Sequence, residues 1–322
     1  MKALEDRLEH PNSQVGFRTT ANVDWRPELV RLLSITVVII FHIEFYTQTL
    51  ENNYSNPLVL LGGLAIGAFM VCSGYVNGLK DEFSQPGSLT GKTYEIYVKK
   101  RFLRLYLGYF LAVNIVFLAK FLAGYTITFS LSGALEFGLT NPLHLTPASL
   151  ALDYSTLWPL VTGYSGGIWP EGWFVSAVIM LSLIYPFLRR LYSLNKFYLY
   201  SLIGVTIVLR VIIGYTINPN YAYYFPFAWT AEFSIGILLG TYIRESNHLA
   251  SHPATYQKII ISLAIRVWPL YLIHMAIIVF MQTYYSPLAI ILLTLLIFAA
   301  TEVFYRLLQF LTKRLGLTNS QK

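Results

Sequence analysis

Two polar side chains in one apolar stretch, Arg31 and His42, have types and a spacing that suit acid–base chemistry. Eleven helical steps of about 100° return a side chain to within roughly 20° of the same face, about 16 Å further along the helix. Both side chains can therefore line one cavity. A histidine there can act as a general base near neutral pH, or it can be a hydrogen-bonded structural group.

A second polar pattern lies in VKKRFLRLY, where Arg101 and Arg104 are three residues apart. On a helix, this spacing puts both side chains on one face. Two neighbouring guanidinium groups suit phosphate, because each presents paired N–H donors, and Lys99 and Lys100 add positive charge. The pattern predicts a site for a polyvalent phosphate. The alternative is that these bases only hold lipid headgroups.

Other side chains are weaker candidates for a site. His274, in YLIHM, is either a second cavity residue or a helix-to-helix hydrogen bond. Glu171 and Trp173, with Trp169, either anchor the chain at the membrane surface or form the rim of a sugar-binding site. The single cysteine, Cys72, lies in an apolar segment and is expected to be a packed thiol.

The composition indicates that membrane helices position these residues. The chain has 322 residues, of which 55% are hydrophobic and only 12% charged, against about 25% charged in an ordinary soluble domain. This excludes a disordered or collagen-like chain, and one cysteine excludes an internal disulfide. We expect an all-α polytopic bundle of eight to ten transmembrane helices. The apolar runs are 29–48, 57–79, 102–122, 172–188, 197–216, 226–243, 259–281 and 286–310.

The basic residues predict the orientation. Nineteen of the 23 lysines and arginines fall in the first polar segment, in alternate loops and at the helix ends beside them. The other four lie within the predicted spans, so the remaining loops carry none. By the positive-inside rule, both termini are cytoplasmic. The net charge of +7 therefore reports topology, and nucleic-acid binding is not favoured. The expected location is the cell membrane, or the inner membrane of a bacterium that has two.

Charges and glycines within the runs predict contacts between helices. Glu302 and Arg306, four residues apart, are expected to pair with each other. Arg210, Glu232 and Arg266 are expected to neutralise one another across helices. Glycines four residues apart predict closely packed helices; the pairs are Gly63 with Gly67, Gly74 with Gly78, and Gly236 with Gly240. Short helices are expected near 131–139 and 148–162 in the longest outer segment.

Taken in order, several segments resemble acyltransferase family 3. WRPELVRLLSITVVIIFH (25–42) is similar to the first helix of that family, including its Arg and His. FMVCSGYVNG (69–78) resembles its Ser-Gly-aromatic run through Ser73, Gly74 and Tyr75. RFLRLY (101–106), AEFSIGILLG (231–240) and LYLIHM (270–275) resemble its Arg-x-x-Arg element and later helices. The chain then divides into a polar cytoplasmic segment (1–24), an acyltransferase-3-like membrane domain (25–312) and a cytoplasmic tail (313–322).

Two positions depart from the family pattern. Val178 and Ile179 occupy a stretch where many members carry Glu, and Leu107 stands where a proline is common. The first departure argues against a mechanism that needs that carboxylate. With no esterase-like domain expected after the last span, the acyl acceptor would be met by the membrane domain itself.

The resemblance implies an O-acyltransferase that moves an acyl group, most commonly acetyl, from cytoplasmic acyl-CoA to a sugar hydroxyl of an outer-side or lipid-linked glycan. It assigns the coenzyme A phosphates to Arg101 and Arg104 with Arg31, and catalysis to His42, either as a general base or as an acylated intermediate. Ser73 and Tyr75 are secondary candidates, and no metal is implied. The alternatives are a transporter or flippase of glycans or acyl carriers, which would not consume a thioester, and a non-catalytic scaffold.

Overall fold

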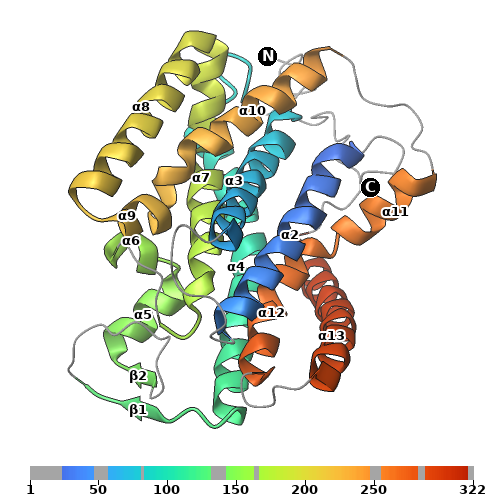
Figure 1. Ribbon diagram of the computed structural model, residues 1–322. Coiled ribbons are helices and arrows are strands. Elements are labelled where there is room, and N and C mark those ends of the chain that lie inside the picture. The colour runs from blue at the N-terminus through green and yellow to red at the C-terminus, as the bar shows by residue number, and fades with distance from the viewer. Residues whose placement is uncertain are drawn as a thin grey trace.

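The protein is a bundle of long helices in the computed structural model, with a small layer of short elements at one end (Figure 1). The structure describes residues 24–46, 57–80, 83–131, 143–162, 167–246, 255–281 and 287–317. The long helices are α2 (Trp25–Tyr46), α3 (Pro57–Gly78), α4 (Gly91–Leu122), α7 (Trp173–Leu194), α8 (Lys196–Thr216), α10 (Thr230–Glu245), α11 (Thr255–Ala264), α12 (Val267–Met281) and α13 (Pro287–Arg314).

All eight apolar runs of the sequence form helices, with α11 and α12 sharing one run. Within the described residues, five segments are long and apolar enough to cross a membrane, namely α3, α4, η2 (Pro170–Gly172) with α7, α8, and the part of α13 from Leu295. The bent pair of α11 and α12, which meet at 48°, would be a sixth. The prediction of a polytopic helical membrane protein is confirmed. By these criteria the number of spans is below the expected eight to ten.

Two of the helices that fall outside these criteria nevertheless pack in the bundle. Helix α10 has sixteen residues, and α2 carries Arg26, Glu28, Arg31 and Glu44 along its length. Helix α3 packs against both, and α12 also packs against α2. These contacts pack one side of the charged helix α2 against the bundle, where charges can face protein rather than lipid.

Helices α3 and α10 meet backbone to backbone. A Cβ atom on Gly74 would lie 1.9 Å from the carbonyl oxygen of Phe233, and one on Gly236 would lie 2.0 Å from that of Val71. Gly78 and Gly240 make equivalent approaches one turn further along. The predicted glycine packing is therefore confirmed for these two pairs. At Gly63 a Cβ would meet nothing within 4 Å, so the close approach does not extend to that glycine.

The short elements lie mainly at the end of the bundle where α4 finishes. Strands β1 (Ile127–Phe129) and β2 (Leu143–Leu145) pair in parallel, and α5 (Pro147–Ser155) and α6 (Trp158–Thr162) follow. Helix α5 begins with reciprocal hydrogen bonds between Thr146 and Ser149, which satisfy its first N–H groups. The short helices expected at 148–162 are present. Those expected at 131–139 lie outside the described residues. Elements α9 (Pro219–Tyr224) and η3 (Pro226–Trp229) link α8 to α10.

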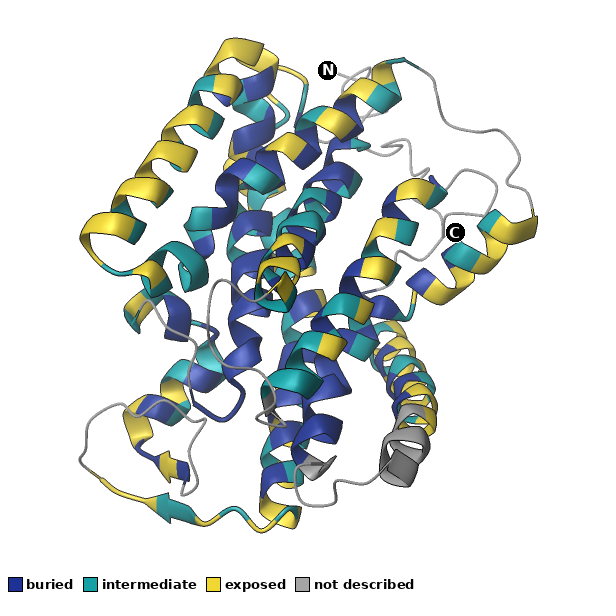
Figure 2. Cartoon of the chain, viewed as in Figure 1, coloured by how far each residue is buried: buried dark blue, intermediate teal, exposed yellow. Residues whose placement is uncertain are grey.

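Burial is greatest along α7 and least along α8 (Figure 2). The apolar window of the segment containing α7 is 78% buried, whereas that of α8 is 6% buried. Exposed apolar side chains cover α8, as expected for a helix whose surface is in contact with lipid. Helix α7 thus forms the centre of the bundle, next to the site described below.

The charges within the helices pair partly as expected. Arg210 Nη1 donates to Glu232 Oε1 at 2.5 Å, and Arg306 Nε donates to Glu302 Oε1 at 2.9 Å. The expectation for Arg266 was wrong, because its Nε donates to Glu302 Oε2 at 2.8 Å. Glu302 therefore holds two arginines, one on its own helix and one at the break between α11 and α12.

Candidate active site

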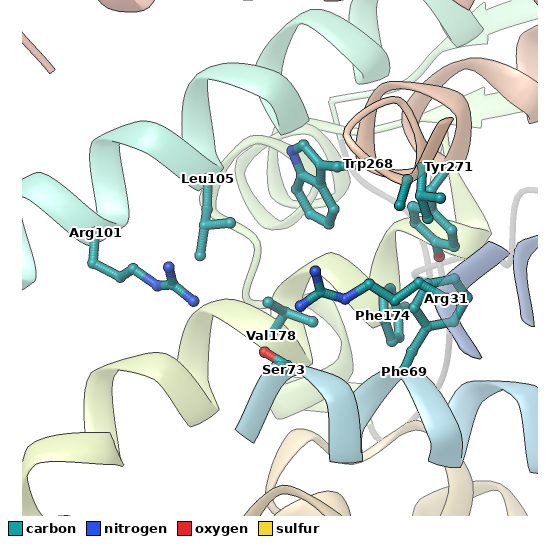
Figure 3. A pocket seen from close by; sticks show the side chains of 11 residues that line it. Arg31, Phe69, Ser73, Arg101, Leu105, Phe174, Val178, Trp268 and Tyr271 are labelled. Atoms are coloured by element: carbon teal, nitrogen blue, oxygen red, sulfur yellow. The ribbon is translucent and has the colours of Figure 1, made fainter. Parts of the chain in front are cut away.

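A pocket of about 180 Å³ lies between α2, α3, α4, α7 and the break of α11 and α12. Its lining combines two arginines and a serine with apolar and aromatic side chains (Figure 3). The lining residues are Arg31, Phe69, Ser73, Arg101, Leu105, Phe174, Val178, Ala264, Val267, Trp268 and Tyr271. The pocket is smaller than the roughly 300–1,000 Å³ of a typical small-molecule site, so it suits one end of an elongated ligand.

The two arginines enter this pocket from opposite sides. Figure 3 shows Arg31 and Arg101 with their guanidinium groups pointing toward one another. Arg31 Nη1 lies 3.0 Å from both carboxylate oxygens of Glu28, and its Nη2 lies 3.3 Å from the carbonyl oxygen of Cys72. Arg101 Nε is buried and has no hydrogen-bond partner among the described residues. Glu28 compensates one of the two charges, which leaves the pocket suited to an anion.

Arg104 lies elsewhere. Its Nη2 donates to the carbonyl oxygen of Leu317 at 2.8 Å, just beyond α13, and it is not among the residues that line the described pocket. The structure therefore brings Arg31 and Arg101 together in the pocket, whereas Arg104, although close enough to Arg101 for their charges to interact, is directed to Leu317. The i, i+3 spacing correctly predicted that both arginines lie on one helical face. It could not predict that Arg101 lines the pocket while Arg104 bonds to the chain just beyond α13.

Tyr271 of α12 forms part of the aromatic wall of the pocket. Its ring centre lies 4.9 Å from that of Phe174 and 5.3 Å from that of His274. Its hydroxyl donates to the backbone oxygen of Glu171 at 2.7 Å. One buried aromatic side chain thus contacts this pocket, which we call the arginine pocket, a histidine, and the short helix η2 just before α7.

Behind Tyr271, the two candidate histidines meet. His42 Nδ1 lies 3.1 Å from His274 Nε2, and the ring centres are 5.1 Å apart. Of the two interpretations for His274, the structure therefore has the helix-to-helix hydrogen bond, and its partner is the predicted catalytic residue. His274 is fully buried, whereas His42 is partly exposed. We call these two residues the histidine pair.

The residues of the Ser-Gly-aromatic run have separate surroundings. Ser73 lines the pocket. Tyr75 is buried, and its hydroxyl hydrogen-bonds to the carboxylate of Asp24 at the start of α2. Cys72 is a buried thiol whose Sγ lies 3.5 Å from the carbonyl oxygen of Pro27. Tyr75 and Cys72 thus join α3 to α2, and only Ser73 faces the pocket.

Glu171 and Trp173 are both buried rather than forming an exposed rim. The Trp173 ring packs against Tyr223 at 5.1 Å and Trp229 at 6.0 Å between ring centres. Glu171 interacts electrostatically with the buried Lys120 of α4. Neither side chain has the exposure that a sugar-stacking rim or a surface anchor requires.

Lys120 also interacts with Asp153 of α5, so these two residues and Glu171 form one group, the outer charge cluster. Asp153 Oδ2 accepts a hydrogen bond from the Ile168 N–H at 3.1 Å. Burial raises the pKa of Asp153 to about 7, although that hydrogen bond and Lys120 act in the opposite direction. The sequence predicted Lys120 in a span and Asp153 in a short helix of the segment that follows, but it contained no signal that would pair them.

A comparison with families of known proteins gives one match. The sequence matches the family model described as "Acyltransferase domain", of acyltransferase family 3, over residues 24–316. No curated protein and no solved structure matches it. Within the described residues, no group of three or more His, Cys, Asp and Glu side chains could hold a metal ion.

Proposed function

From the premise that this chain belongs to acyltransferase family 3 and is a multi-pass membrane acyltransferase, we propose that it transfers an acetyl or similar acyl group from coenzyme A to a sugar hydroxyl. The donor would enter from the cytoplasm and the acceptor would be an outer-side or lipid-linked glycan. The protein would act in the cell membrane, which is the inner membrane in a bacterium that has two.

One observation carries the proposal: two arginines face each other across a pocket, and the aromatic wall of that pocket contacts the histidine pair. Guanidinium groups recognise phosphate through paired N–H donors. Val178 contributes an apolar side chain to the lining, in the stretch where the resemblance suggests a carboxylate. The net positive charge of Arg31, Arg101 and Glu28 is therefore available to the phosphates of the donor.

The proposed chemistry needs one base. The acceptor hydroxyl oxygen attacks the thioester carbonyl carbon, so that a C–O bond forms and the C–S bond breaks. The hydroxyl proton passes to the His42 imidazole and from it to the thiolate of coenzyme A, so the histidine is regenerated. Arg101 and Arg31 hold the phosphate end of the donor, and Tyr271 separates this charged region from the reacting groups.

The test uses the full chain in vesicles, with labelled acetyl-CoA and a membrane extract that contains glycan acceptors. His42→Ala should lower transfer by at least about 10³-fold while coenzyme A binding remains, because only the base is removed. His144→Ala is the matched control, since His144 is exposed on β2 and is not among the residues that line the pocket. Transfer by the His42 variant at the wild-type rate would contradict the proposal. Transport of a glycan without thioester consumption would favour a carrier instead.

A further inference from the structure

We propose that His274 is a positioning residue that fixes the tautomer of His42, so that the His42 nitrogen that accepts the proton is Nε2. This inference rests on the proposed function for its kinetic consequence, but not for its structural content. It starts from two hydrogen bonds made by the two nitrogens of one buried imidazole.

The first hydrogen bond determines the proton position on His274. Its Nδ1 lies 2.6 Å from the carbonyl oxygen of Tyr271, and the carbonyl of Leu270 also bonds to this ring. A carbonyl oxygen has only lone pairs, so Nδ1 must carry the hydrogen. The histidine is 0% exposed in an apolar helix, and burial of that kind opposes a second proton on the ring. His274 is therefore neutral, with a lone pair on Nε2.

The second hydrogen bond determines the position of the ring hydrogen on His42 of α2. His274 Nε2 lies 3.1 Å from His42 Nδ1, and because the former is an acceptor, the latter must be the donor. The carbonyl of Val38, one turn before His42, bonds to the same ring and also needs an N–H donor. A neutral His42 with its hydrogen on Nδ1 carries its lone pair on Nε2.

The two hydrogen bonds act in sequence on the histidine pair. The carbonyl oxygen of Tyr271 determines which nitrogen of His274 carries the hydrogen, and His274 in turn determines this for His42. The hydrogen of His42 is then on Nδ1, and its Nε2 has the lone pair that takes a proton from an acceptor hydroxyl. The same logic applies wherever one ring nitrogen of a catalytic histidine is held by a second group while the other reacts. His274 acts only through His42, so it is not itself a catalytic residue.

The first experiment is independent of activity. Nitrogen NMR of the histidine-labelled full chain in bilayers distinguishes the two neutral tautomers, and spectra of His42→Ala and His274→Gln assign the signals. We expect the hydrogen on Nδ1 in both members of the histidine pair. A hydrogen on Nε2 of His274 would overturn the inference, whether or not the protein transfers acyl groups.

The second experiment is kinetic and uses two substitutions. In His274→Gln, the side-chain oxygen can accept the hydrogen bond from His42, whereas in His274→Leu nothing can. We expect the leucine variant to lose about 10²-fold in kcat with an unchanged KM for the thioester, and the glutamine variant to stay within about fivefold of wild type. Wild-type kcat in the leucine variant, or equal losses in the two, would overturn the positioning role.

The two experiments separate this inference from the proposed function. If the wild-type chain transfers no acyl group, the proposed function fails, and the tautomers measured by NMR still decide the inference. If His274→Leu does not fold, the glutamine variant and the NMR spectra decide it. Coenzyme A binding by each variant reports whether its pocket is intact.

Discussion

Charged side chains are buried in two regions of the molecule, the arginine pocket between α2 and α4 and the outer charge cluster at the far end of α4. In the pocket, two cations face one another with a single nearby carboxylate, and one guanidinium nitrogen has no hydrogen-bond partner among the described residues. In the cluster, Lys120 is placed near two carboxyl groups. An arrangement with uncompensated charge favours a ligand, whereas one in which opposite charges lie together needs no ligand to compensate them.

The largest expected effect that distinguishes the two regions is on ligand binding. Arg101→Ala should weaken coenzyme A binding by about 100-fold, or about 3 kcal/mol, because it removes the pocket cation that no described carboxylate pairs with. Isothermal titration of the full chain in detergent or nanodiscs measures this directly. Lys120→Met is the comparison variant, and its affinity should stay near wild type. Equal losses in both variants would remove the distinction between pocket and cluster.

The next effect concerns the stability of the cluster. Gly167 has a φ of +67°, and a Cβ atom there would lie 1.9 Å from Asp153 Oδ1. Gly167→Ala should therefore destabilise the protein by about 2–3 kcal/mol, because it adds both a backbone strain and a clash. Thermal unfolding followed by tryptophan fluorescence measures the loss. A melting temperature equal to wild type would show that the cluster tolerates displacement of Asp153.

A smaller effect depends on pH. Since the folded pKa of Asp153 is raised to about 7 from an ordinary value of 3.8, its ionisation is harder in the folded state. For this group, stability should be greatest below pH 4, should fall as the pH rises from about 4 to 7, by roughly 2 kcal/mol between pH 5 and 7, and should level off above pH 7. Asp153→Asn should flatten that dependence while its amide oxygen still accepts from Ile168. A dependence unchanged by the substitution would assign it to another group.

The smallest effect on binding is expected at Arg104. Its guanidinium donates to Leu317 rather than facing the pocket. Arg104→Ala should change coenzyme A affinity by less than about threefold, or about 0.7 kcal/mol, while it lowers the melting temperature. Arg104→Lys should behave similarly in binding. A loss as large as that of Arg101→Ala would place both arginines at the phosphates, as the sequence alone suggested.

The sequence predicted the helices well because bilayer-length apolar runs impose them. It placed Arg31 and His42 on one face of a single helix and expected both to line one cavity. In the structure Arg31 lines the described pocket, whereas His42 does not and instead contacts His274, beyond Tyr271. Contacts between helices were harder to predict from the sequence. The pairing of Arg266 with Glu302, rather than with Glu232, depends on where α11 breaks and how α12 packs on α13.

The candidate site was predictable in its residue types but not in its arrangement. The separation of Arg101 from Arg104 depends on where the chain after α13 returns to α4. The contact between His42 and His274 joins residues that are 232 positions apart in the chain. The outer charge cluster requires α5 to fold back over α4, and no period in the sequence encodes that return.

The close contact between α3 and α10 also limits how the pocket can admit its ligand. Since no side chain separates the two backbones at Gly74 and Gly236, α3 has no room to retreat toward α10. The opposite wall contains the break of α11 and α12, and Ala264 and Val267 line the pocket on either side of it. The pocket is therefore fixed on the side of α3 and has a break between two helices on the side of α11 and α12, so that side is where the pocket can widen for a bulky donor without moving α3.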